Sequence, residues 1–282
     1  MGPTQLPDGN GLARELLVEM GVAYPGDPSD NLALIAQYYE RPFLDRVALY
    51  EYMHQRFFRG QVEAPLARVA QVLASIPNND TSRFLVTTNY DVIIERAFRE
   101  AGRPICVITQ NMRDPDHGGA QVQVIPPDGI PTVEEARDLV LEVYPRGTTF
   151  LFKMHGSAHN EKIDKRDDLI ITENDYVDFL VNAGGRMSPN FPPASLAAAF
   201  KTRRFLFLGY SLRDWNFRAF LRLLELRNAL SGRDQLRHLA VQMSPGQLEI
   251  ELWNQRNVNV YDGDLLQFCD RLAAAGNVEP VQ

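Results

Sequence analysis

The sequence predicts an α/β protein with an open, mostly parallel sheet flanked by helices. Short apolar runs alternate with helix-like patterns over most of the 282 residues. Most of these runs are apolar throughout rather than alternating with polar residues, which is typical of parallel strands covered on both faces. Several helix-like patterns also carry capping residues at their ends. Strand followed by helix, repeated along a chain, favours a layered α/β architecture.

The expected strands are short apolar runs bounded by polar residues, glycine or proline. They cover residues 84–88, 104–109, 148–154, 204–209, 238–242 and 258–261. The run LIIT at 169–172 could form a further short strand or an extended loop. The Gly- and Pro-rich stretches 111–131 and 182–194 are expected to be loops.

Helices are expected between these strands. Their patterns cover residues 92–98, 132–144, 214–232, 244–253 and 264–276. Thr132 with Glu135, and Ser244 with Gln247, have the spacing of capping boxes. Residues 25–76 are helical in pattern and rich in aromatic residues. We interpret them as a helical insert within a single domain that spans residues 1–282.

Composition disfavours several classes of protein. The formal net charge is -7 and the pI is about 5.3, whereas direct binding to nucleic acid needs a basic stripe. Cys106 and Cys269 are the only cysteines, which disfavours a disulfide framework and suits a reducing compartment. No stretch is apolar enough for a membrane span, and the first residues lack the pattern of a signal peptide. We therefore expect a cytoplasmic protein.

Polar residues follow three of the predicted strands where each apolar run stops. They are Thr87, Thr88, Asn89 and Asp91, then Lys153, His155, Gly156 and Ser157, and finally Gly209, Ser211 and Asp214. Ligands of open α/β sheets bind outside the carboxyl ends of the strands, so we expect one site there. Structural roles stay open for single members: Asp91 could cap a helix, Asn89 could serve a turn, and His155 could be a buried imidazole with satisfied hydrogen bonds.

Other chemistries lack their motifs. The segment GYSLR at 209–213 has no final glycine, so a nucleophile elbow is poorly supported. There is no HExxH zinc motif and no GxxxxGK[ST] phosphate loop. No bound metal is expected.

Four segments, in order, resemble the motifs of the sirtuin-like domain of bacterial antiviral defence proteins. They are TTNYDVIIERAF, FLFKMHGS, IITENDYVDFL and FLFLGYSLRDWNFRAFL, within residues 84–272. The resemblance implies a Rossmann-like sheet that binds NAD, with a helical module inserted. It also implies hydrolysis of NAD+ rather than protein deacetylation. The zinc-ribbon cysteines of the deacetylases are absent, since two separate cysteines cannot supply four ligands, and this also points away from deacetylation.

The resemblance also implies roles for residues. Asn89 and His155 take the catalytic positions, and Asp91 matches the acid beside the nicotinamide amide. An imidazole can accept a proton at cellular pH, and an amide can orient water or ribose. The residues expected to contact the dinucleotide are Thr87, Thr88, Asp91, Gly156, Ser157, Gly209, Ser211, Asp214 and Asp262.

One departure concerns the first residues. Members of the family begin with a strand and a glycine-rich turn that holds the pyrophosphate. Here LPDGNGLARELL, residues 6–17, resembles the segment just after that turn, so we expect the strand and turn to be missing.

The expected function is NAD+ hydrolysis that depletes the cofactor during phage infection. Control by a homo-oligomer or by an ATPase or Argonaute-type partner is implied, since unregulated depletion would kill the host. The alternative is a non-catalytic regulatory subunit that binds NAD or ADP-ribose. A third possibility is an assembly subunit that binds no nucleotide.

Overall fold

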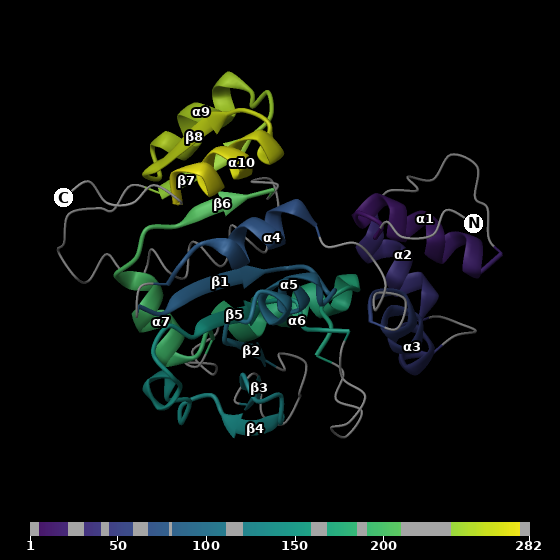
Figure 1. Cartoon of the computed structure of the whole chain (residues 1–282). Helices are drawn as coiled ribbons and strands as arrows, with labels where there is room; N and C mark the ends of the chain where they lie inside the picture. The colour runs from purple at the N-terminus through teal and green to yellow at the C-terminus, as the bar shows by residue number, and fades with distance from the viewer. Residues whose placement is uncertain are drawn as a thin grey trace, which may run out of the picture.

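The computed structural model describes residues 6–21, 31–40, 45–58, 67–78, 81–110, 121–158, 168–184, 191–209 and 238–276. These residues form a five-stranded sheet of order β1-β5-β2-β3-β4 and a three-stranded sheet of order β6-β7-β8 (Figure 1). The strands are β1 (Arg83–Thr87), β2 (Ile105–Gln110), β3 (Gln121–Ile125), β4 (Thr132–Glu135), β5 (Thr149–Lys153), β6 (Leu206–Leu208), β7 (His238–Gln242) and β8 (Val258–Asp262).

The pairs that the six predicted strands form with one another are all parallel. β5 lies between β1 and β2, and Lys153 is opposite Thr87 on one side and Thr109 on the other. β6, β7 and β8 are also parallel. The six predicted strands are confirmed to within two residues at each end, and with them the α/β fold class.

The two sheets share one core. Within the described residues, β1 pairs only with β5 and β6 only with β7, so each is an edge strand. The Arg203 guanidinium, just before β6, lies 4.3 Å from the ring centre of Phe84 in β1. The amino ends of the two edge strands therefore meet, and Figure 1 shows β6 running beside β1.

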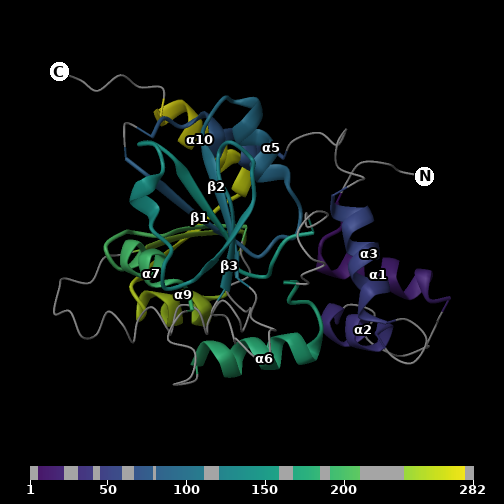
Figure 2. The ribbon, with the colours of Figure 1, turned by 90° about the horizontal axis from the view of Figure 1, so that it is seen from below.

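Helices cover both faces of the sheets. The described helices, of which the first three lie beside the sheets rather than over them, are α1 (Gly9–Glu19), α2 (Leu32–Tyr39), α3 (Arg46–Phe57), α4 (Arg68–Ser75), α5 (Ile93–Glu100), α6 (Glu173–Gly184), α7 (Ala194–Lys201), α9 (Gln247–Asn254) and α10 (Leu265–Gly276). In Figure 2, α5 and α10 lie on one face, and α6, α7 and α9 lie on the other.

The continuous apolar runs of the strands are explained by this double cover. Leu151 of β5 belongs to the core under α4 and α5, while its neighbours Phe150 and Phe152 belong to the core under α6, α7 and α9. Successive side chains of a strand point to opposite faces, so a strand covered on both faces needs apolar residues at every position.

The helices α1, α2 and α3 form a body of their own beside the sheets (Figure 1). Their shared core includes Leu16, Ile35 and Met53 and extends to Tyr90 and Ala158, which follow β1 and β5. α4, in contrast, packs against α5 and α10 in the layer that covers the sheets. Residues 25–76 are thus helical where they are described, but α4 belongs with the sheet layers. The single-domain boundary and the insert stay predictions.

The helix expected at 132–144 was wrong. Residues 132–135 form β4, which pairs antiparallel with β3, and a short 3₁₀ helix (Leu141–Val143) follows. The capping box does not form, because its two residues lie in a strand and no helix starts there, and the Thr132 hydroxyl instead donates to the Glu134 carboxylate at 3.1 Å. Backbone pairing with a neighbouring strand overrides a local helical pattern.

The loop expected at 111–131 was wrong in part, because residues 121–125 form β3. This segment, QVQVI, alternates polar and apolar residues, and only Val122 and Val124 are buried. Such alternation is typical of a strand with one buried face, so the pattern was present in the sequence.

The helix expected from residue 244 begins later, at Gln247, and Gly246 is its cap. Ser244 instead has a left-handed backbone with φ of 52°. Residues 169–172 are buried but form no strand, which confirms the extended-loop alternative. The helix expected at 214–232 lies outside the described residues. Among those that are described, no helix has both the length and the apolar character that a bilayer crossing requires.

Candidate functional site

The ends of β1 and β5 bring two predicted site residues to equivalent positions. Thr87 and Lys153 are partners in the parallel register, so Asn89 and His155 each lie two residues beyond a paired strand end. Backbone bonds continue past the strands, because Met154 N–H donates to the Thr87 carbonyl at 2.9 Å and Ala158 N–H donates to the Tyr90 carbonyl at 3.1 Å. The two residues therefore occupy matching places on adjoining segments.

The segment after β1 forms a turn into α5. Thr87 Oγ1 accepts from the Asn89 N–H at 3.1 Å, and Asp91 Oδ1 accepts from the Ile93 N–H at 2.9 Å. Thr88 and Asp91 are partly buried, whereas Asn89 is exposed. Asp91 thus helps to start α5, in agreement with the alternative that it caps this helix. Asn89 is exposed at the surface.

The Asp91 carboxyl has an altered affinity for protons. Burial raises its pKa above the ordinary value of 3.8, while the nearby Lys153 ammonium and the hydrogen bond from Ile93 act in the opposite direction. Burial disfavours the charged form of a carboxyl group. A carboxylate held in this way is a hydrogen-bond acceptor beside Asn89.

His155 is only 3% exposed. Its ring makes edge contacts with Tyr176 and Phe179, with centroids 5.6 Å and 6.4 Å away. Its carbonyl accepts from the Ile170 N–H at 3.1 Å. The ring is therefore buried and packed, as the structural alternative requires, whereas satisfied hydrogen bonds at its nitrogens stay a prediction. The residue lies two positions beyond the end of β5.

Glycine is required at position 156. Its φ is +80°, and a Cβ there would lie 2.3 Å from the Asp168 carbonyl oxygen. The next residue, Ser157, is buried, and its N–H donates to Asp168 Oδ1 at 3.3 Å. Asp168 thus shapes the strand end through both its backbone and its side chain. Sequence reasoning missed it, because it lies in no motif.

Two further buried residues, which the sequence analysis did not identify, contact the segments that carry the site. Glu95 of α5 is buried and accepts from Lys153 Nζ at 2.9 Å. His54 of α3 is buried, with its Nδ1 2.6 Å from the Ala158 carbonyl. Glu95 is a charged residue on a helix face that is otherwise apolar and buried. That position in the sequence indicates that the carboxylate needs a buried cation as its partner.

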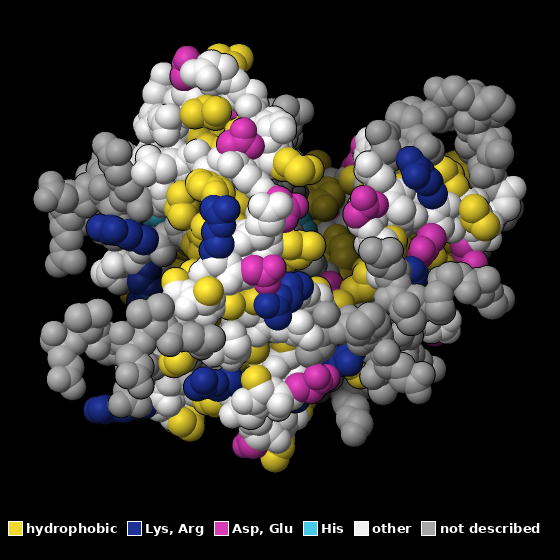
Figure 3. Space-filling view, turned by 45° about the horizontal axis from the view of Figure 1, so that its top comes forward, with side chains coloured by type: hydrophobic (Ala, Val, Ile, Leu, Met, Phe, Trp, Pro, Cys, Tyr) yellow, Lys and Arg dark blue, Asp and Glu magenta, His cyan; other side chains and the backbone are white. Residues whose placement is uncertain are grey.

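The body formed by α1, α2 and α3 is tied to the site by Arg46. Its guanidinium donates to Asp175 Oδ2 at 2.9 Å and to the Leu169 carbonyl at 2.7 Å. Asp175 also accepts from the Ile171 and Thr172 N–H groups at the start of α6. In Figure 3 the surface is hollowed between this body and the rest of the molecule, and hydrophobic side chains lie in the hollow.

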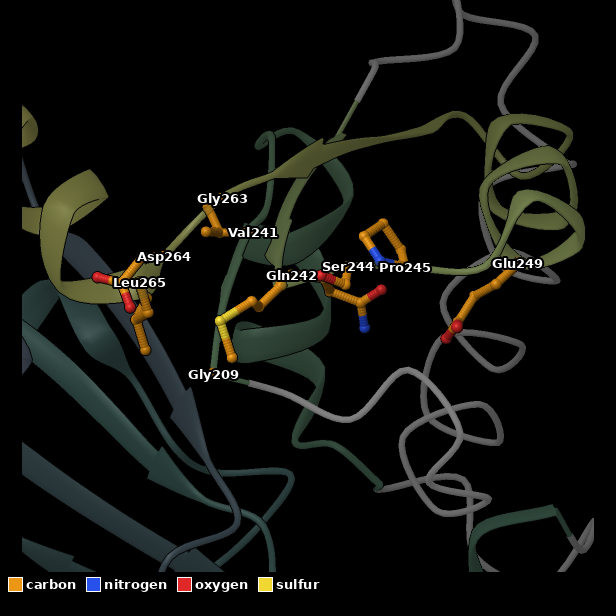
Figure 4. Close-up of a pocket in the computed structure, with 10 residues that line it drawn as sticks. Gly209, Val241, Gln242, Ser244, Pro245, Glu249, Gly263, Asp264 and Leu265 are labelled. Atoms are coloured by element: carbon orange, nitrogen blue, oxygen red, sulfur yellow. The ribbon is translucent and has the colours of Figure 1, made fainter.

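A second concave region lies at the carboxyl ends of β6, β7 and β8. This open cavity has a volume of about 440 Å³. Its lining consists of Gly209, Val241, Gln242, Met243, Ser244, Pro245, Glu249, Gly263, Asp264 and Leu265 (Figure 4). Figure 4 shows Gly209 across from the loop after β7, with the start of α10 on one side and Glu249 of α9 on the other.

Hydrogen bonds organise the rim of this cavity. Asp262, exposed at the end of β8, accepts from the Ser244 N–H at 2.8 Å. Gly263 N–H donates to the Gln242 carbonyl at 2.8 Å, and Asp264 Oδ1 accepts from the Gln267 N–H at 2.9 Å as the cap of α10. A helix start beside a polar cavity suits a ligand with negative charge.

The predicted residues thus fall into two groups. Thr87, Thr88, Asn89, Asp91, His155, Gly156 and Ser157 lie at the ends of β1 and β5, and Gly209 and Asp262 lie at the ends of β6 and β8. Ser211 and Asp214 lie outside the described residues. No group of His, Cys, Asp or Glu that could hold a metal ion occurs in the part of the chain that the structure describes.

Comparison with known proteins gives one family. The sequence pattern described as SIR2-like domain matches residues 83–261, from the first residue of β1 almost to the end of β8. A search of curated proteins found no match. The matched segment is more than half of the chain and contains every candidate residue except Asp262.

Proposed function

The chain belongs to the SIR2-like domain family, whose activity is related to NAD, and we propose that it cleaves NAD+ into nicotinamide and ADP-ribose. The observation that supports this proposal is the register of β1 with β5, since it puts Asn89 and His155 at matching positions on adjoining strand ends. An amide is suited to orient water or ribose, and an imidazole is suited to accept a proton.

The roles follow from the charge that develops during the reaction. Breaking the bond between nicotinamide and ribose leaves positive charge on the sugar in an oxocarbenium-like transition state. His155 accepts a proton from a ribose hydroxyl or from water, and Asn89 orients the attacking water or the ribose. Asp91 accepts from the carboxamide N–H group of nicotinamide, which places the leaving group beside the two catalytic residues.

The adenosine half of the dinucleotide occupies the cavity at β6, β7 and β8 in this proposal. Its volume of about 440 Å³ lies in the usual range for small-molecule sites. Asp262 and the start of α10 offer an acceptor for ribose hydroxyls and a partial positive charge for phosphate. The nicotinamide half then reaches the ends of β1 and β5.

The biological role proposed here is defence against phage by depletion of NAD+. Such an activity must be restrained in an uninfected cell, so control by a homo-oligomer or by a defence partner of the ATPase or Argonaute type belongs to the same proposal. Wild-type turnover that is equal in a dilute monomer and in every assembled form would contradict control by assembly.

The direct test is nicotinamide release by purified protein. Asn89→Ala and His155→Ala should each lower kcat by about 100-fold or more, the scale for loss of a positioned acid–base or orienting group. Asn254→Ala, at an exposed asparagine that ends α9, is the matched control and should retain the wild-type rate. Unchanged turnover in both site variants would remove this mechanism.

A non-catalytic regulatory subunit is the second candidate, and the burial of His155 favours it. Its ring is only 3% exposed and packed against Tyr176, so contact with a ligand would require a change in the residues around it. Calorimetry would select this function if ADP-ribose bound while no nicotinamide was released from NAD+, alone or in complex. Release of nicotinamide that depends on His155 would reject it.

A further inference from the structure

Lys153 is a fully buried cation directly behind the candidate site. It is the last residue of β5, and its side chain is 0% exposed. Its ammonium group donates to Glu95 Oε1 at 2.9 Å, to the Tyr90 carbonyl at 3.4 Å and to the Asp91 carbonyl. An ammonium has three N–H donors, and each of them has an acceptor here.

These acceptors belong to the segments that carry the candidate site. The Tyr90 and Asp91 carbonyls are in the turn that begins with Asn89, and Glu95 is on α5, which follows that turn. Lys153 itself precedes His155 by two residues on β5. One side chain thus connects the strand of His155, the turn of Asn89 and the helix after it.

Stability alone does not account for an ion pair at this place. Removing two charges from water costs so much that a buried pair is often no better than apolar residues of similar volume. What the pair provides is geometry, because an ammonium ties two backbone carbonyls in one fixed arrangement. We propose that Lys153 is a positioning residue that holds the Asn89 turn in register with His155. The inference rests on the proposed cleavage of NAD+ for its functional consequence.

The test uses a double variant that removes both charges. Lys153→Met alone would leave the Glu95 carboxylate buried without its cation, so Lys153→Met with Glu95→Leu keeps the volume and avoids that cost. The matched control is Arg68→Met with Asp270→Leu. That pair, 2.7 Å apart, joins α4 to α10 and is exposed, so its loss removes the same charges far from the turn.

Two measurements separate positioning from mere support of the fold. In the Lys153–Glu95 double variant, kcat for nicotinamide release should fall by about 100-fold with little change in KM, since a small misplacement of reacting groups has that effect. Amide hydrogen exchange at residues 88–92 should rise by about tenfold, while exchange in β2 should stay at the wild-type level. The control pair should leave both quantities unchanged.

A single variant covers the case in which the double variant does not fold. Glu95→Gln retains an oxygen acceptor for the Lys153 ammonium and leaves the Lys153 bonds to the turn carbonyls in place, although the loss of the counter-charge lowers the unfolding free energy. It should keep kcat within about threefold of the wild type, because those bonds hold the turn. A loss of about 100-fold in Glu95→Gln would assign the effect to the charge of the pair and overturn the inference.

The outcomes for the two proposals are distinct. Wild-type kcat and wild-type exchange in the double variant would overturn the role of Lys153 and leave the NAD+ cleavage proposal standing. Absence of nicotinamide release from the wild type would refute the cleavage proposal, and the exchange of residues 88–92 would still decide whether Lys153 orders the turn.

Discussion

At the scale of single residues, Gly156 carries the sharpest steric constraint at the site. Gly156→Ala adds a Cβ 2.3 Å from a backbone oxygen at a φ of +80°. Gly129→Ala is the control, since Gly129 has the same φ and open space around it. The control should lose about 1 kcal/mol of unfolding free energy from left-handed backbone strain alone. Gly156→Ala should lose about 3 kcal/mol or more in chemical denaturation. Equal losses would show that the contact with Asp168 relaxes.

Asp91 predicts a dependence of stability on pH. Burial raises the pKa of this acid in the folded state above 3.8, so below both pKa values the group is neutral and imposes no cost. As pH rises through the folded pKa, the carboxyl must ionise in a buried place and stability is lost. Asp91→Asn removes that loss and keeps an oxygen acceptor for the Ile93 N–H. Its unfolding free energy relative to the wild type should therefore increase from about pH 4 to about pH 7 in urea titrations.

The control for this prediction is Asp128→Asn. The exposed Asp128 carboxylate accepts from the N–H two residues on, at 3.2 Å, as Asp91 does. The same pH trend in both variants would show that the trend does not come from the burial of Asp91.

At the scale of elements, the attachment of α3 to α6 decides how the body of α1, α2 and α3 is held. Thr172 and Asp175 form reciprocal capping bonds, since the Asp175 N–H donates to Thr172 Oγ1 at 3.1 Å and the Thr172 N–H donates to Asp175 Oδ2 at 2.9 Å. Arg46, the first residue of α3, donates to the same carboxylate. One buried carboxylate thus starts α6 and anchors α3.

Arg46→Met should loosen this attachment. It leaves the buried Asp175 carboxylate without its cation and should cost about 2 kcal/mol of unfolding free energy. Hydrogen exchange should rise in α2, α3 and the start of α6, and should stay unchanged in β2. The control is Arg56→Met, which breaks the pair of α3 with Glu15 inside the same body. Equal exchange at α6 in both variants would contradict an anchoring role for Arg46.

At the scale of the whole molecule, two sheets with one shared core present their carboxyl ends to a common ligand in our proposal. The ends of β1 and β5 carry Asn89 and His155, and the ends of β6, β7 and β8 form the cavity. In this proposal the adenosine half binds in the cavity and the nicotinamide half binds at the ends of β1 and β5, so only the complete dinucleotide contacts both sheets.

This division predicts distinct protection by AMP and by NAD+. AMP should slow hydrogen exchange at residues 241–245 and 262–265 only, whereas NAD+ should also slow it at residues 88–92. The measurement uses Asn89→Ala, which binds NAD+ in this proposal and turns it over slowly. At 100 times its Kd either ligand should add about 2.7 kcal/mol to stability, which is visible as a rise in Tm. Protection of residues 88–92 by AMP would contradict the assignment of the halves.

The parallel strands were predictable because burial on both faces leaves a continuous apolar run, as in FLVTT and FLFKM. β3 was predictable in principle from the alternation of QVQVI. β4 was not, because TVEE has no strong strand pattern and is held by its pairing with β3. Which residues follow a strand end was also readable, and Asn89 and His155 are at the expected places.

The sequence by itself thus determined the fold class, the strands and the polar residues that follow them, since all of these depend on periodicity and on near neighbours. Only the tertiary structure decided which strand ends adjoin, that Lys153 reaches Glu95 and the turn carbonyls, and that Arg46 holds Asp175 across 129 positions. The reason is physical. A buried charge or a close backbone approach is set by the partner that folding brings to it, and that partner leaves no periodic pattern in the chain.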